Sequence, residues 1–119
     1  MTLAITSRIV SEVVIIDLSG RLCFLESGLR QQVNELLDEL HRDFILNLAD
    51  VPYIDSYGLG QLVSIWTSIR GQGGHMILLR PTDRIRELFQ ITKLDTVFEI
   101  LHDEVQAVRQ IRKTVAAAV

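Results

Sequence analysis

Ser56 is the residue best placed in this sequence to do chemistry, because its hydroxyl falls where a helix is predicted to begin. It follows Asp55 and precedes Tyr57. Apolar residues then recur at the offsets of one helical face, namely Leu59, Leu62, Val63, Trp66 and Ile69. Ser56 is therefore expected at or beside the N-cap, among backbone N–H groups that no helical carbonyl can reach. Those amides and the positive end of the helix dipole favour an anion such as a phosphate.

The Ser56 hydroxyl can also serve merely as a helix cap, which contributes about 1 kcal/mol of stability. The neighbouring residues favour a contact surface instead. Gly58 and Gly60 lie in the predicted first turn, although a glycine in a helix interior costs about 1 kcal/mol against alanine. We therefore expect something to approach the backbone closely there. Tyr57 lies off the apolar face, so its ring is expected to be exposed.

No other group of residues has the spacing of a catalytic or metal site. His41, His75 and His102 are scattered and lack the spacing of a zinc pair. Cys23 would need a histidine within hydrogen-bond reach to act as a nucleophile, and a small buried cysteine is the alternative interpretation. Gly71–Gly74 lacks the lysine and hydroxyl residue that complete a P-loop. We expect no enzyme activity, no bound metal and no cofactor.

Strands and helices must alternate to position Ser56. Short runs of β-branched and apolar residues predict strands at residues 3–9, 13–18, 44–48, 76–79 and 97–101. Helical spacing and capping residues predict about four helices: from a Ser27 cap to near His41, from Ser56 to Gly71, from Thr82 or Asp83 past Ile85, Leu88 and Phe89, and from an Asp103 cap past Val105, Val108 and Ile111.

The order of these elements predicts the fold class. The first two strands are joined by a short turn and are expected to pair antiparallel, whereas the later strands require parallel pairing through right-handed crossovers. The expected fold is α/β: one domain with a mixed, mostly parallel sheet of about four to five strands, an N-terminal antiparallel pair and about four helices. In such sheets functional loops gather beyond the carboxyl ends of the parallel strands, and Ser56 lies on that edge.

The composition fits one small binding domain. With 119 residues, of which 48% are hydrophobic and 23% charged, the chain has room for one core and is expected to fold. Its net charge of −3 and its lack of a basic stripe argue against a nucleic-acid partner. Apolar stretches such as Val13–Ile16 are too short to cross a bilayer, and the N-terminus lacks a signal-peptide pattern. We expect a cytoplasmic protein without membrane insertion, and its single cysteine cannot form an internal disulfide.

Several segments together resemble the STAS domain family, and within it the stand-alone bacterial anti-sigma factor antagonists. The loop Asp50–Ile54 leads into Asp55–Leu62, which is similar to the family's Asp-Ser-x-Gly-Leu-x-x-Leu segment. Gly73–Leu79 resembles the family's glycine pair before a strand, and Ile85–Leu94 resembles its next helix. The resemblance implies a STAS domain over residues 1–113, followed by a frayed tail over residues 114–119.

The resemblance also implies a phosphorylation-controlled partner switch. In the family, the serine that matches Ser56 is phosphorylated by an anti-sigma factor that is itself a kinase, and a separate phosphatase reverses the reaction. The unmodified form would bind the anti-sigma factor and free its sigma factor, and phosphorylation would block that binding. The partner-binding residues implied in this chain are Asp55, Tyr57, Gly58, Leu59, Gln61 and Arg21.

This chain departs from the family pattern at a few positions. Cys23 stands where an acidic residue is common, and Tyr57 stands where a small hydroxyl residue is common. Tyr57 can therefore either shield Ser56 or anchor the partner. Asn47 and Ala49 replace residues that are often acidic and hydroxylated, which we interpret as neutral changes at a strand end.

Two other functions stay open at this point. STAS domains also serve as accessory subunits of transport systems or as parts of stress-sensing complexes without phosphorylation, and fold cannot separate these roles. A receiver-type signalling domain is a more remote alternative, because such domains need paired carboxylates for magnesium, whereas the strand ends here offer only the lone Asp17. The sequence does not predict the oligomeric state.

Overall fold

Five strands form one sheet, in which they lie side by side in their order along the chain, β1-β2-β3-β4-β5. The computed structural model describes residues 3–23 and 28–117. β1 pairs antiparallel with β2, and the remaining neighbours pair parallel. The strands are β1 (Ala4–Val10), β2 (Val13–Ser19), β3 (Asp43–Asp50), β4 (His75–Leu79) and β5 (Glu99–Leu101). The predicted α/β class with a mixed, mostly parallel sheet is confirmed.

A two-residue turn joins β1 to β2. Val10 pairs with Val13, and the two residues between them, Ser11 and Glu12, have φ angles of 50° and 71°. Positive φ at both central residues is the requirement of a type I′ turn, whose twist matches that of the strands it joins. The turn sets the register of the whole antiparallel pair.

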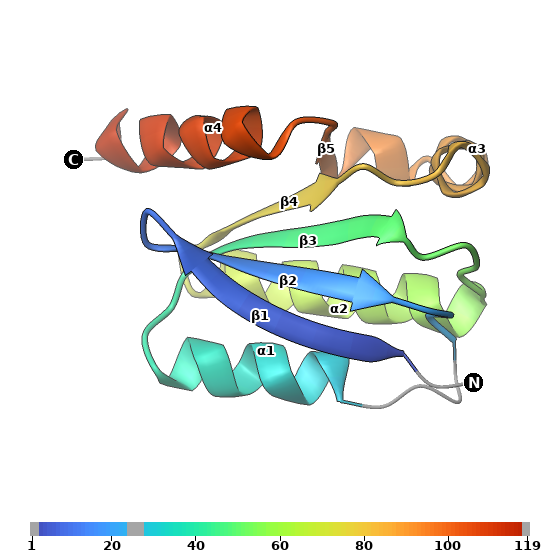
Figure 1. Cartoon of the computed structure of the whole chain (residues 1–119), viewed down its shortest axis with the longest axis horizontal. Helices are drawn as coiled ribbons and strands as arrows, with labels where there is room; N and C mark the ends of the chain where they lie inside the picture. The colour runs from blue at the N-terminus through green and yellow to red at the C-terminus, as the bar shows by residue number, and fades with distance from the viewer. Residues whose placement is uncertain (1–2, 24–27, 118–119) are drawn as a thin grey trace.

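Helices cover both faces of the sheet unequally (Figure 1). One face packs on α1 (Leu29–Asp38), α2 (Ser56–Gly71) and α3 (Asp83–Ile91), and the other packs on α4 (Glu104–Ala117). A 3-10 turn, η1 (Leu94–Thr96), connects α3 to β5. α4 extends to Ala117, so it includes residues 114–117 of the segment expected to be a frayed tail.

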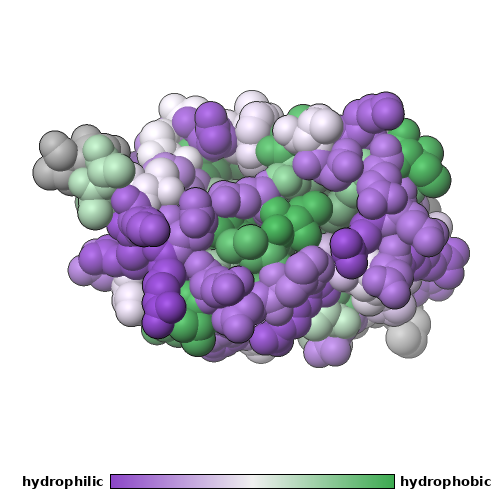
Figure 2. Space-filling model, turned by 90° about the horizontal axis from the view of Figure 1, so that it is seen from above, coloured by the Kyte–Doolittle hydropathy of each residue, from purple (hydrophilic) through white to green (hydrophobic). Residues whose placement is uncertain are grey.

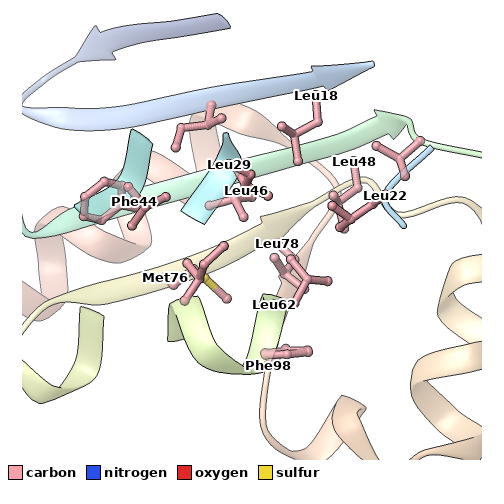
Figure 3. Close-up of a cluster of buried hydrophobic side chains, with 14 of the residues drawn as sticks. Leu18, Leu22, Leu29, Phe44, Leu46, Leu48, Leu62, Met76, Leu78 and Phe98 are labelled. Carbon is pink, nitrogen blue, oxygen red and sulfur yellow. The ribbon is translucent and has the colours of Figure 1, made fainter. Parts of the chain in front are cut away.

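Alternation along the strands divides the core into two clusters. The larger cluster lies against α1, α2 and α3, and Figure 3 shows side chains from β2, β3 and β4 with Leu62 of α2 in this layer. Its fully or almost fully buried strand residues are Val14, Ile16, Leu18, Phe44, Leu46, Leu48, Met76 and Leu78. The smaller cluster lies against α4 and contains Val13, Ile15, Ile45, Ile77, Leu79, Ala107 and Ile111.

Several element boundaries differ from the prediction. Gly28, with a φ of 105°, is the residue before α1, while the predicted Ser27 cap lies outside the described residues. α1 ends at Asp38, and His41 N–H donates to the Leu36 carbonyl at 3.0 Å in the turn that follows. The last strand begins at Glu99 and not at residue 97, because the 3-10 turn occupies the chain just before it.

The apolar face predicted for α4 was wrong at Val105. Its side chain is 60% exposed, whereas Ala107 and Ile111 are buried. Residues four apart lie on the same face of a helix, so Ala107 and Ile111 define the buried face and Val105 falls on the opposite side. The predicted Asp103 cap is confirmed, because its Oδ1 accepts from the Gln106 N–H at 3.1 Å.

A charged cluster connects the first hairpin to α4. Arg8 donates to Asp17 at 2.8 Å and to Glu104 at 2.6 Å. These hydrogen bonds hold the pKa of Asp17 and that of Glu104 below the ordinary carboxyl range, and they raise the pKa of Arg8. Asn47 also belongs to this cluster through its side chain. Its Nδ2 donates to Asp17 at 2.8 Å, and its Oδ1 accepts from the Ala49 N–H at 3.1 Å. The interpretation of Asn47 as a neutral change at a strand end does not account for these two side-chain hydrogen bonds.

Candidate functional site

The start of α2 is built around Asp55. Asp55 is the N-cap residue, with an extended backbone, and its Oδ1 accepts from the Gly58 N–H at 2.8 Å. Its carbonyl accepts from the Leu59 N–H at 2.9 Å, which closes the first helical turn. Ser56 is the first residue of α2 and is exposed. The predicted position of Ser56 beside the cap is confirmed, and Asp55, not Ser56, supplies the capping side chain.

The segment after β2 holds this helix start in place. Leu22 and Ile54 form a parallel β-bridge. Leu22 N–H donates to the Tyr53 carbonyl at 3.0 Å, and Asp55 N–H donates to the Leu22 carbonyl at 3.3 Å. Leu22 is fully buried. The two loops at the carboxyl ends of β2 and β3 are therefore joined by backbone hydrogen bonds directly before Ser56.

Gly58 is the point of closest approach. A Cβ atom built there would overlap the Leu22 carbonyl oxygen and lie 3.0 Å from Ile54 Cγ2. The close approach predicted from the glycines therefore comes, at Gly58, from the chain's own backbone. Gly58 is buried, whereas Gly60 is exposed and a Cβ there would meet nothing within 4 Å. The two glycines of this turn thus have different surroundings.

The remaining predicted partner-binding residues differ in exposure. The Tyr57 side chain is 55% exposed, as expected from its place off the apolar face. Leu59 is half-buried and packs against the larger core cluster, and Gln61 is also half-buried. Arg21 is exposed, and its guanidinium carbon lies 4.5 Å from the centre of the Tyr53 ring. Ser56, Tyr57 and Arg21 are therefore the members of the set most open to contact.

A cleft of about 200 Å³ next to this site was not predicted. It lies between the loop before α2 and one side of α3 and is lined by Tyr53, Ile54, Arg84, Ile85, Glu87, Leu88 and Ile91. Ile91 is 78% exposed. The aromatic Tyr53 just before the Asp-Ser pair was the available signal in the sequence, but nothing in the sequence shows that α3 packs beside it.

The three histidines lie near the ends of different elements. His75 Nδ1 lies 2.9 Å from Asp43 Oδ1, at the end of the sheet where β3 and β4 begin. The carbonyl of His102 accepts from Arg80 at 2.9 Å. Cys23 is half-buried and its thiol is free. Residues 3–23 and 28–117 contain no group of three or more His, Cys, Asp or Glu side chains that could hold a metal ion.

The surface viewed from the α4 side is mainly hydrophilic, with apolar atoms gathered in separate patches (Figure 2). Of the helices in the described part of the chain, none has both the length and the apolar character needed to span a bilayer.

Comparisons with known proteins agree with this arrangement. The STAS domain family model matches residues 4–118. A Thermotoga maritima protein, provisionally named an anti-sigma factor antagonist, is 30% identical over 108 residues, which cover 89% of this chain and 96% of that protein. The anti-sigma-B factor antagonist of Bacillus subtilis is 38% identical over 64 residues, or 54% of this chain and 59% of that protein.

A solved structure shows the same fold at lower identity. The Bacillus cell fate determinant SpoIIAA in its phosphorylated form superposes with a TM-score of 0.72 and 23% identity, over 91% of this chain and 99% of that one.

Proposed function

Because this chain belongs to the STAS domain family, we propose that it is an anti-sigma factor antagonist whose binding to an anti-sigma factor kinase is controlled by phosphorylation of Ser56. The observation that carries the proposal is the exposed Ser56 at the first position of α2, beside a cap supplied by Asp55. The hydroxyl is not needed as the cap, so it is available for modification.

In its unmodified form this end of the molecule binds the anti-sigma factor. Tyr57 offers an exposed aromatic ring, and Arg21 offers a cation held over Tyr53. Aromatic and arginine side chains are the residues most often responsible for affinity at protein interfaces. Gly58 contributes indirectly, because its lack of a side chain allows Leu22 to approach and fixes the direction of α2. The bound anti-sigma factor then releases its sigma factor.

Phosphorylation changes the charge at the centre of this surface. A phosphoserine carries about −1.5 to −2 charge units at neutral pH. The N-terminus of α2 tolerates that charge because the helix dipole favours anions there, so the fold survives the modification. A partner docked over Ser56 would instead bury an uncompensated charge next to the Asp55 carboxylate, which is strongly unfavourable. Phosphorylation therefore releases the partner without unfolding the domain.

The chemistry of the transfer belongs to the partners. The kinase passes the γ-phosphoryl group of ATP to Ser56 Oγ, which loses its proton, and ADP leaves. The kinase supplies the nucleotide and magnesium, so this chain needs no cofactor. A phosphatase restores the hydroxyl by hydrolysis. Such a cycle places the protein in the cytoplasm, where the sigma factor acts.

The first test is phosphate transfer. The protein is incubated with ATP and the cognate histidine-kinase-like anti-sigma factor and then analysed by mass spectrometry. We expect one phosphate on the parent chain and none on Ser56→Ala. Thr67→Ala is the matched control, because Thr67 is an exposed hydroxyl residue on the same helix and its loss should leave transfer unchanged. Absence of phosphate on Ser56 with every cognate candidate would refute the switch.

The second test is partner binding measured by titration calorimetry. Ser56→Ala should bind the anti-sigma factor like the parent, and Ser56→Asp should bind at least about tenfold more weakly. If both variants bind as well as the parent, position 56 has no role in the interaction. Tyr57→Ser distinguishes the two possible roles of the Tyr57 ring. If the ring anchors the partner, the variant should bind the anti-sigma factor more weakly. If the ring shields Ser56, the variant should be phosphorylated faster than the parent.

Gene neighbourhood distinguishes this proposal from a transport role. A gene for a kinase-type anti-sigma factor beside this one supports the antagonist. Adjacent transporter genes, together with an absence of phosphorylation in the first test, support an accessory subunit.

A further inference from the structure

β1 lies at the border of the sheet with a neighbour on one side only (Figure 1). Within residues 3–23 and 28–117, its backbone hydrogen-bonds to β2 and to no other segment. A border strand presents a row of backbone donors and acceptors to any chain that can pair with it. The residues of β1 decide whether this border is open or protected.

The turn between β1 and β2 determines which backbone groups point outward. The turn pairs Val10 with Val13. In a two-residue turn, the N–H of the residue after the turn donates to the carbonyl of the residue before it, so the Val10 carbonyl points toward β2. Hydrogen-bonded and non-hydrogen-bonded positions alternate along an antiparallel pair. Arg8, like Val10, therefore directs its N–H and C=O toward β2, and Ile5, Ser7 and Ile9 direct theirs toward the open side.

β1 lacks the usual protection of a border strand. Natural border strands are blunted by proline, lysine, a bulge or an inward-pointing charge. The sequence Ala4–Val10 contains no proline or lysine, and its pairing with β2 is continuous over seven residues. Its one charge, Arg8, is bound by Asp17 and Glu104. Ile9, a large apolar residue of this strand, is 59% exposed.

We propose that two copies of this chain associate through β1, as an antiparallel pair with a two-fold axis at Ser7. Ser7 is the middle residue of the seven-residue strand, so this register pairs the strand along its entire length. It opposes Ser7 to Ser7, Ile5 to Ile9 and Thr6 to Arg8. All outward-pointing backbone groups of Ile5, Ser7 and Ile9 then meet outward-pointing groups of the second copy.

The same register also matches the side chains. Ile9 of each copy comes to lie against Ile5 of the other, which covers the exposed Ile9 side chain. A two-fold axis at Arg8 would bring two like charges together, which is destabilising, whereas the axis at Ser7 places each Arg8 opposite a threonine. The pairing uses no residue of the surface around Ser56, so each copy keeps its own partner-binding site and the inference does not depend on the proposed function.

The first test measures mass in solution by analytical ultracentrifugation of the full chain over a range of concentrations. We expect a dimer, with dissociation on dilution. Ser7→Pro removes an N–H that points away from β2, so it should leave the fold intact while weakening dimerisation about tenfold or more. Ser7→Ala keeps that N–H and should dimerise like the parent. A parent chain that is a monomer at every concentration, or a folded Ser7→Pro variant that dimerises as tightly as the parent, would overturn the proposal.

The second test examines the register by cross-linking in a Cys23→Ser background. Paired Cα atoms at the two-fold axis would be about 5.5 Å apart, which is within the range that a disulfide can span. Ser7→Cys should therefore form a covalent dimer under mild oxidation. Ile9→Cys is the control, because position 9 also directs its backbone groups toward the second copy. In this register the two cysteines at position 9 would lie about 14 Å apart along the strands, so they should remain unlinked. Equal cross-linking of both variants, or of Ile9→Cys alone, would exclude this register.

Discussion

Replacing Gly58 by alanine should destabilise the protein, whereas the same replacement at Gly60 should stabilise it. Both glycines lie near the start of α2, and in an open helix position alanine is about 1 kcal/mol more favourable than glycine. At Gly60 a Cβ would meet nothing within 4 Å. At Gly58 it would overlap the Leu22 carbonyl oxygen and press on Ile54.

The magnitude at Gly58 follows from what must move. The Leu22 carbonyl accepts from Asp55 N–H, and Leu22 is fully buried and bridged to Ile54. Shifting this backbone strains the connection between two loops, and overpacking of this kind costs about 1–3 kcal/mol. The gain in helix propensity offsets part of that cost. We expect Gly58→Ala to lose about 1–2 kcal/mol and Gly60→Ala to gain up to about 1 kcal/mol.

Equilibrium unfolding in urea can measure both changes. Trp66 is the single tryptophan of the chain. It lies on α2 and packs against the larger core cluster, so its fluorescence reports unfolding of this helix. The midpoint of unfolding should fall for Gly58→Ala and rise for Gly60→Ala, with similar slopes for the two variants and the parent. Equal midpoints for the two variants would refute the idea that Gly58 is required by the approach of Leu22.

Two further changes test the cap and the charged cluster. Asp55→Ala should lower the free energy of unfolding by about 1 kcal/mol in the same urea assay, and Asp55→Asn should restore most of it, because asparagine also caps helices; equal losses would refute the capping role. Arg8→Gln should lower stability at pH 7 by at most about 1 kcal/mol, because the Arg8 side chain is partly exposed and solvent weakens its ion pairs. Asp17 and Glu104 have folded-state pKa values below those of the unfolded chain. Their contribution is thus complete above the ordinary carboxyl pKa and is lost as the pH falls through the lowered values. The difference between parent and Arg8→Gln should therefore shrink as the pH falls below the ordinary carboxyl range and disappear once both carboxyl groups are protonated. A difference that persists in that acid limit would exclude an ionic origin.

Local sequence signals were sufficient for the elements that surround Ser56. The buried strand, the Asp-Ser pair and the apolar spacing from Leu59 to Ile69 together predict where α2 begins, and each signal depends on neighbouring residues only. For the same reason the sequence predicts an exposed Tyr57. The sequence makes both Asp55 and Ser56 candidates for the cap, since both residue types cap helices well, and the structure assigns the cap to Asp55.

Features that depend on contacts between distant segments were not predictable. Gly58 and Gly60 look alike in the sequence, and only the return of Leu22 to the start of α2 separates them. The prediction for the buried face of α4 was wrong at Val105, which is exposed, and right at Ile111 and Val108, which contact the smaller core cluster. Ala107 is also buried in that cluster, because it lies four residues before Ile111 on the same face. The cleft beside Tyr53 depends on the packing of α3 against a loop about thirty residues earlier, which no local pattern encodes.

The order of the strands has a consequence for how the chain folds. Each strand after β1 pairs with the strand that precedes it in the chain, so the sheet can grow by one strand at a time as the polypeptide is synthesised. Each of these pairings closes a connection of at most 24 residues. The contacts that close the molecule come last, since Arg8 binds Glu104 and Arg112 binds Glu12 across about a hundred residues. Until α4 docks, Ile15, Ile45 and Ile77 remain uncovered on one face of the sheet. A nascent chain that stalls before Glu104 should therefore be the form most prone to aggregate.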